Sequence, residues 1–326
     1  MSRKSRAIIT GIAGFAGSYL AELLLAEGYD VYGFLAPGEK KDNIKHLSGK
    51  INLDRFDIVK EDKVGRYITS IKPVFIYHLA ALSSVGKSFA LERQTYDVNF
   101  TGTLNIFEAA RNSGKSLRKL IFTSSADIYG KFKPTNKVLT ETQEFNPNSP
   151  YGISKAAAEY LANYYVNHHG LPIVISRSFN HTGPRHSETF VVPSFCKQIA
   201  AIERGDVKPI ISVGDLSARR DLSDVRDITN GYYLMALKGF PGDVYQLCSG
   251  RTVAIKTVLD KLLKLALVPI KVRVDRSRLR KSDIPVLKGD NTRAKKHLGW
   301  TCRYSLEDTL IDTVDFWRQK LGTKTI

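Results

Sequence analysis

Three glycines near the start of the chain constrain its fold more than any other feature. Gly11, Gly14 and Gly17 follow the apolar run 6–10 and precede a helix-like stretch that ends at Gly28. Glycines at this spacing let the backbone turn tightly and pass close to a phosphate, and the following helix offers unpaired N–H groups to it. The pattern predicts a strand, a glycine turn and a helix that bind a dinucleotide pyrophosphate, although the commonest fingerprint is GxGxxG.

Short apolar runs and helix-like stretches alternate through the first half of the chain. The later runs are 30–35, 74–81, 119–125 and 172–177. Such alternation predicts an α/β fold with a doubly wound parallel sheet of the Rossmann type, and ligands bind at the carboxyl ends of such strands. Most of the candidate site residues follow these runs directly.

The pattern changes after residue 178. Short helices, basic loops and Pro/Gly punctuation follow, and they predict a smaller mixed α/β lobe that binds the substrate. We expect a dinucleotide-binding domain of residues 1–178 plus about 225–248, and a second lobe of residues 179–224 and 249–326. No linker of low complexity separates them, so we expect close packing with a cleft between the two.

Tyr151 and Lys155 lie four residues apart at the start of a predicted helix. Positions i and i+4 share one helix face, so the phenol and the ammonium point into the same space. A neighbouring cation favours the phenolate, so Tyr151, with an ordinary pKa of about 10, could exchange a proton with a substrate near neutral pH. A solvated helix face would show the same spacing, and the other motifs decide between the two interpretations.

The end of the second predicted strand bears on the choice of dinucleotide. NAD sites usually have a carboxylate there for the ribose 2′-hydroxyl, but this strand ends in Phe34-Leu35-Ala36 and the first acid is Glu39. Without that acid nothing repels a 2′-phosphate, and Lys40 and Lys41 follow. We therefore favour NADP(H) as the cofactor, with NAD(H) as the alternative.

The composition excludes several other classes of protein. No apolar run approaches the roughly 20 residues that span a membrane, and the basic start leads into a strand without a cleavage site, so we expect a cytoplasmic protein without a membrane partner. Three scattered cysteines predict neither a disulfide framework nor a metal site. The net charge of +17 is spread along the chain, which does not predict a nucleic-acid partner; anionic ligands or a merely basic surface explain it.

Five motifs in sequence order resemble the extended short-chain dehydrogenase/reductase family, over about residues 6 to 318. They are Gly11-x-x-Gly14-x-x-Gly17, Asp57-Ile58, His78-Leu79-Ala80-Ala81, Ser124-Ser125-x-x-x-Tyr129-Gly130 and Tyr151-x-x-x-Lys155. The resemblance implies that Tyr151 is the catalytic acid/base, that Lys155 lowers its pKa and holds the nicotinamide ribose, and that Ser125 hydrogen-bonds the sugar carbonyl or hydroxyl. The implied cofactor-binding residues are Gly11, Gly14, Phe15, Ala16, Gly17, Asp57, Ile58, Leu79, Ala80, Ala81, Tyr151 and Lys155. His78, alone in an apolar strand, is more often a packed residue.

A later segment resembles the branch of this family that acts on GDP-sugars. Residues 179–185, 190–191 and 198–200 carry the resemblance to 4,6-dehydratases and 4-ketoreductases. The dehydratases have Thr-(Asp/Ser)-Glu where this chain has Ser125-Ala126-Asp127. Alanine cannot be the acid that dehydration needs, and aspartate is one methylene shorter than the usual base. The resemblance therefore implies reduction of the 4-keto group of GDP-4-keto-6-deoxy-D-mannose to GDP-D-rhamnose with NAD(P)H, with Tyr151 as proton donor.

Other activities remain open. A GDP-mannose 4,6-dehydratase and a nucleotide-sugar 4-epimerase are the alternatives, and an intact catalytic trio argues against a non-catalytic relative. Arginines suit the substrate diphosphate because they give bidentate contacts. The resemblance implies that the substrate-binding residues are Ser125, Asp127, Asn180, Arg185, Lys197, Arg220 and Arg280. It also implies a homodimer through a helix bundle, formed by the helices around 95–112 and 154–167.

Overall fold

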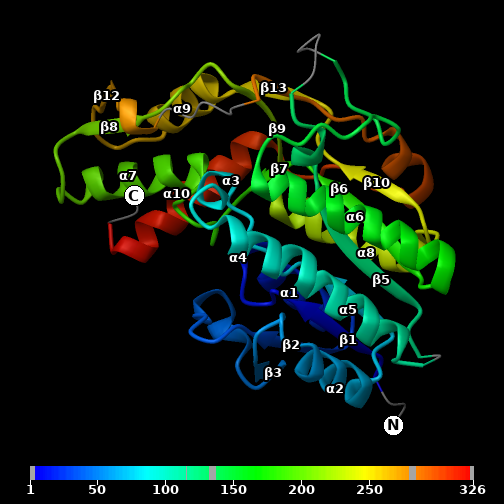
Figure 1. The fold of residues 1–326 in the computed structure, drawn as a ribbon. Helices are drawn as coiled ribbons and strands as arrows, with labels where there is room; N and C mark the ends of the chain where they lie inside the picture. The colour runs from blue at the N-terminus through cyan, green and yellow to red at the C-terminus, as the bar shows by residue number, and fades with distance from the viewer. Residues whose placement is uncertain (1–3, 115, 132–136, 279–283, 324–326) are drawn as a thin grey trace.

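The computed structural model describes residues 4–114, 116–131, 137–278 and 284–323. Its centre is a seven-stranded sheet in which all neighbouring strands are parallel (Figure 1). From one edge to the other, the strands are β10 (Val244–Leu247), β6 (Ile173–Ser178), β5 (Lys119–Ser125), β4 (Phe75–His78), β1 (Arg6–Thr10), β2 (Asp30–Leu35) and β3 (Asn52–Arg55). The predicted doubly wound α/β fold is confirmed, with the reversal of strand order between β1 and β4.

Helices cover both faces of this sheet (Figure 1). One face packs against α1 (Phe15–Ala26) and α8 (Val225–Lys238), and the other packs against α2 (Glu61–Ile71), α5 (Gly102–Arg111) and α6 (Pro150–His169). The strands supply apolar side chains to both layers, because successive residues of a strand point to opposite faces. Both faces are therefore buried.

Short helical segments connect the larger elements around the crevice. They are the 3-10 helices Asp42–Leu47 and Ala126–Tyr129, the helices α3 (Val85–Ser88) and α4 (Glu92–Tyr96), and the π-helix Asp97–Thr101 that leads into α5. None of the helices in the described ranges is long and apolar enough to cross a membrane.

A second group of elements builds its own apolar core, and we call this group the smaller lobe. Its members are β7 (Asn180–Thr182), α7 (Val191–Glu203), β8 (Ile210–Val213), β9 (Arg219–Asp224), β11 (Thr252–Ala254), α9 (Ile255–Lys264), β12 (Lys271–Val274), β13 (Val286–Leu287) and α10 (Leu306–Leu321). Strands β11, β9, β13 and β7 form one small sheet, and β8 pairs with β12. Between its parts the chain returns to the large sheet through α8 and β10. The predicted domain boundaries themselves remain a prediction.

Candidate active site

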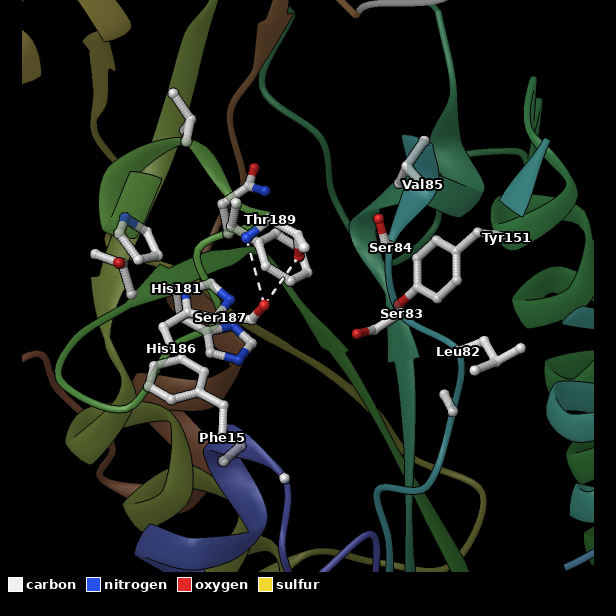
Figure 2. Close-up of a pocket in the computed structure, with 18 of the residues that line it drawn as sticks. Phe15, Leu82, Ser83, Ser84, Val85, Tyr151, His181, His186, Ser187 and Thr189 are labelled. Atoms are coloured by element: carbon white, nitrogen blue, oxygen red, sulfur yellow. Dashed lines mark hydrogen bonds between the residues drawn. The ribbon is translucent and has the colours of Figure 1, made fainter. Parts of the chain in front are cut away.

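One cavity of about 1650 Å³ runs from the carboxyl ends of β1 and β2 into the smaller lobe. Every predicted site residue in the described part of the chain lines this cavity. Arg280 lies outside the described residues. Figure 2 shows the two sides of the opening, with Phe15, His181 and His186 on one side and Tyr151 with Ser83 on the other. Residues from all five sequence motifs, which are spread over residues 11–155, therefore meet in one place.

The glycine turn is packed too closely to hold side chains. A Cβ added to Gly11, where φ is +71°, would lie 2.9 Å from the Ala80 nitrogen, and one on Gly17 would overlap the Gly11 carbonyl. The Ala80 amide donates to the Thr10 hydroxyl at 3.0 Å, which joins the ends of β4 and β1. The N-terminus of α1 therefore faces the cavity as a cradle of backbone, the kind of surface to which a pyrophosphate binds.

His78 is a packed residue, as expected. Its Nδ1 lies 2.8 Å from the Thr10 hydroxyl and its Nε2 lies 2.9 Å from the Thr103 hydroxyl. Burial, and secondly the charge of Lys155, lower the pKa of His78 to about 3. The neutral ring therefore joins β4 to β1 and α5.

Local capping fixes Tyr151 in the first turn of α6. The Ser149 hydroxyl accepts a hydrogen bond from the Gly152 amide at 3.0 Å, and Pro150 occupies the first helical position. Lys155 follows one turn later and donates from Nζ to the Thr123 carbonyl of β5 at 2.8 Å. Tyr151 is 8% exposed and Lys155 is 3% exposed, and both line the cavity.

The protonation of this pair differs from the expectation based on sequence. Burial, followed by the charge of Asp127, raises the pKa of Tyr151, and a hydrogen bond from Ser125 acts in the opposite direction. Burial also lowers the pKa of Lys155 to about 8. The pKa of Tyr151 is thus raised, and not lowered as the neighbouring Lys155 predicted, because burial disfavours the phenolate. Tyr151 is therefore a neutral phenol near pH 7 and can donate a proton.

Ser125 and Asp127 lie where β5 ends. The Ser125 hydroxyl caps the 3-10 helix by accepting from the Asp127 amide at 3.1 Å, and it is 3.2 Å from Asp127 Oδ2. Ala126 between them is buried. The cavity therefore presents a hydroxyl, a carboxylate and the neutral phenol of Tyr151 together.

The cations of the smaller lobe have different surroundings. Lys197 pairs with Glu188 at 3.1 Å, and Arg220 donates from Nη1 to the Ile284 carbonyl at 2.6 Å. Arg185 has a positive φ of 70° and pairs with Glu22 of α1 at 2.8 Å. This pair attaches the loop of Arg185 to α1, and the predicted contact of Arg185 with the substrate stays a prediction. Asn180 is exposed at the start of β7.

An aromatic stack lies on one side of the opening, and no local pattern in the sequence predicts it. The ring of Phe15 stacks on His186 with centroids 4.2 Å apart (Figure 2). His186 in turn stacks on Phe190 at 4.3 Å. Burial, and secondly His181, lower the pKa of His186 to about 3. Phe15 belongs to the glycine turn, whereas the other rings precede α7, so only the tertiary fold brings them together.

The sequence patterns did not indicate two further polar residues near the cavity. Arg55, the last residue of β3, donates to the Ala36 carbonyl at 2.8 Å, beyond the end of β2. Asn99 of the π-helix donates to Ser154 of α6 at 2.9 Å and accepts from the Leu82 amide at 2.8 Å. Both contacts depend on neighbours in space, not on neighbours in sequence.

Comparison with known proteins gives the family. The sequence profile described as "GDP-mannose 4,6 dehydratase" matches residues 8–313. The chain belongs to this family. The GDP-mannose 4,6-dehydratase family is part of the extended short-chain dehydrogenase/reductases, so the resemblance stated from the motifs is confirmed, as is the prediction of an NAD(P)-dependent nucleotide-sugar enzyme.

Members of this family with different activities are similar to the chain. The GDP-6-deoxy-D-mannose reductase of Pseudomonas aeruginosa is 28% identical over 97% of this chain and 98% of its own length. GDP-mannose 4,6 dehydratase 2 of Arabidopsis thaliana is 31% identical over 95% of this chain and 86% of its own. The solved structure of RMD from Pseudomonas aeruginosa complexed with NADPH has a TM-score of 0.83 at 27% identity, covering 97% of this chain and 100% of that one. Identity alone does not separate reductase from dehydratase.

Proposed function

We propose that the chain is a 4-ketoreductase that converts GDP-4-keto-6-deoxy-D-mannose to GDP-D-rhamnose. The observation that carries this proposal is the sequence Ser125-Ala126-Asp127 beside the neutral phenol of Tyr151. Reduction of a ketone needs one proton donor and one hydroxyl that orients the carbonyl. Dehydration also needs an acid for the C6 hydroxyl, and the buried methyl group of Ala126 cannot supply one.

The side chains have separate tasks in this reaction. A reduced nicotinamide supplies the hydride when it is bound. The Ser125 hydroxyl hydrogen-bonds the ketone oxygen, and the Tyr151 phenol donates its proton to that oxygen as the carbonyl is reduced. Lys155, with a pKa of about 8, is mostly charged at neutral pH and stabilises the phenolate that remains. Tyr151 then recovers a proton from solvent.

The residues at the other end of the cavity suit NADPH. The crowded glycine turn leaves backbone next to the N-terminus of α1, which suits the pyrophosphate. Asp57 and Ile58 line the adjoining wall and would contact the adenine. Arg55 pairs with the last residue of β2, and its guanidinium reaches the Ala36 and Glu39 carbonyls, where it could bind a 2′-phosphate. Glu39 also lines this end, and its carboxylate is the argument for NADH as the alternative.

We assign the diphosphate of the nucleotide sugar to the smaller lobe. Arg220 and Lys197 line the cavity there and supply positive charge, with Asn180 nearer the sugar. Arg280 remains a prediction from the sequence. Arg185 is better explained by its pairing with Glu22.

A GDP-mannose 4,6-dehydratase is the alternative. The observation in its favour is the Asp127 carboxylate, which lies in the cavity beside Ser125 and could remove a proton from C5 of the sugar. A 4-epimerase would use the same Ser125 and Tyr151, and it would keep its nicotinamide bound through each cycle.

The loss of reduced-nicotinamide absorbance on mixing with GDP-4-keto-6-deoxy-D-mannose tests the proposal. We expect oxidation of NADPH, slower oxidation of NADH, and a GDP-linked 6-deoxyhexose as product. Absence of oxidation would contradict the proposal. Conversion of GDP-mannose without added cofactor would then support the dehydratase, and tightly bound NAD in the purified protein would support the epimerase.

We also propose a homodimer through α5 and α6. The two helices are neighbours on the same face of the sheet (Figure 1), and α6 exposes Ile153, Tyr160 and Tyr164 on its outer side. Light scattering on the purified protein should give the mass of two chains. Tyr160→Glu with Tyr164→Glu should give one chain, whereas a dimer that survives both changes must use another surface.

A further inference from the structure

A buried arginine connects the helix of Tyr151 to the turn of Ser125. Arg177, on β6, donates from Nε and Nη2 to Oε1 of Glu159 at 2.9 and 2.6 Å. Its Nη1 donates to the Tyr129 hydroxyl at 2.8 Å. All three side chains are buried, and Glu159 is fully so. One guanidinium therefore holds two elements through its rigid fork of N–H groups.

The Tyr129 hydroxyl is itself a junction. It accepts hydrogen bonds from Arg177 and, at 2.6 Å, from the side-chain amide of Gln246 on β10, and it donates to the Thr140 carbonyl at 3.0 Å. Burial raises the pKa of Tyr129 to about 12, so the hydroxyl keeps its proton at neutral pH. It uses its donor and both acceptor positions.

Tyr129 and Glu159, at the two ends of this network, belong to the same helical elements as Ser125 and Tyr151 or follow them directly. Tyr129 closes the 3-10 helix that begins immediately after Ser125. Glu159 follows Tyr151 by eight residues and Lys155 by four on α6, so the three side chains lie along one helix face. The network thus spans from the hydroxyl side of the candidate site to the phenol side.

The two elements also touch each other directly. A Cβ on Gly152, in the first turn of α6, would lie 2.9 Å from the Asp127 carbonyl oxygen of the 3-10 helix. Gly130, which ends that helix, has φ of +61°, and a Cβ there would overlap the Asn146 carbonyl. With so little free space, a shift of one element displaces the other.

We propose that Tyr129, Arg177 and Glu159 form a positioning network that keeps the Ser125 hydroxyl and the Tyr151 phenol aimed at one ketone oxygen. None of the three lines the cavity, so each acts through Ser125 or Tyr151. The inference rests on the proposed function, because it requires these two groups to act on the same atom. Misplacement by about 1 Å can cost about 100-fold in rate, so a buried hydrogen bond outside the cavity can matter for turnover.

Tyr129→Phe is the most sensitive test, because it removes the junction hydroxyl and keeps the packed ring. On the nucleotide sugar that supports turnover, we expect kcat to fall about tenfold, while the KM values for sugar and cofactor change less than about twofold. Tyr165→Phe is the matched control: this buried tyrosine of α6 donates to Glu108, remote from Ser125. The control should lose similar thermal stability and keep its kcat.

Arg177→Lys is the second variant. Lysine keeps the charge but cannot bind Glu159 and Tyr129 through one fork, so we expect the same pattern of reduced kcat with unchanged KM. If Tyr129→Phe keeps full kcat, or if Tyr165→Phe loses as much, the inference is overturned. Tyr151→Phe separates the two proposals. If this variant retains turnover, the proposed function is overturned and this inference with it. If Tyr151→Phe is inactive while Tyr129→Phe keeps full activity, only this inference is overturned.

Discussion

Arg185 of the smaller lobe forms an ion pair with Glu22 of α1, with 2.8 Å between Nη1 and Oε1. Its guanidinium also lies over the Tyr19 ring, 4.3 Å from the centroid. The pair joins the loop before α7 to the helix that follows the glycine turn. An arginine that the sequence assigned to the substrate is therefore attached to the cofactor side of the cavity.

Glu22→Gln should weaken cofactor binding, because the loop loses one of its anchors on α1. We expect the KM for the nicotinamide cofactor to rise about threefold, in line with the value of about 0–1 kcal/mol for a partly exposed ion pair, with little change in the KM for the nucleotide sugar. Glu27→Gln, immediately after α1, is the control, because Glu27 accepts a hydrogen bond from Tyr233 and does not pair with Arg185. A larger rise in the sugar KM would instead support the predicted contact of Arg185 with the substrate.

Asp127→Asn should move the pH profile of kcat. Tyr151 donates only while it carries its proton, so activity falls as the pH rises through its pKa, and Asp127 raises that pKa. Removing the charge lowers the pKa, so the basic limb should move to lower pH while turnover continues at neutral pH. Glu39→Gln, at the far end of the cavity, should leave the limb in place. Complete loss of activity at every pH would instead make Asp127 the essential base of a dehydratase.

Lys155→Met should stabilise the fold while it abolishes turnover. Burial lowers the pKa of Lys155 from 10.5 to about 8, so the folded protein holds the charged form at a cost. That cost is fully present below about pH 8 and disappears as the pH rises towards 10.5. The substitution also removes the hydrogen bond to Thr123, which offsets part of this gain. We expect a net gain of about 2 kcal/mol in the free energy of unfolding at pH 7, measured by urea denaturation. An equal gain at pH 7 and pH 10.5 would contradict this origin.

Arg55→Ser should reduce the preference for NADPH. Charge-assisted hydrogen bonds contribute about 1.5–3 kcal/mol, so the KM for NADPH should rise about tenfold or more while that for NADH changes less than about twofold. Arg66→Ser, an exposed arginine on α2 that pairs with Asp62, is the control. Equal effects on both cofactors would place the 2′-phosphate elsewhere.

Features that depend on residues close together in the sequence could be predicted from the sequence alone. The glycine turn and the Tyr151/Lys155 spacing depend on local geometry, so their places at the end of β1 and in the first turn of α6 could be predicted. Arg55 could not, because it reaches Ala36 from the neighbouring strand β3. The raised pKa of Tyr151 could not either, because desolvation depends on everything packed around the phenol.

The stack of Phe15, His186 and Phe190 joins the glycine turn to the loop before α7. A rigid hinge motion between the large sheet and the smaller lobe must separate Phe15 from His186, and aromatic contacts of this kind contribute about 0.5–1.5 kcal/mol each. Segment 183–190 belongs to neither of the two large apolar cores and is held against α1 by these rings and by the ion pair of Arg185 with Glu22. The glycine turn and the loop before α7 are therefore coupled on this side of the cavity, and a substitution that removes one ring changes the packing of both segments.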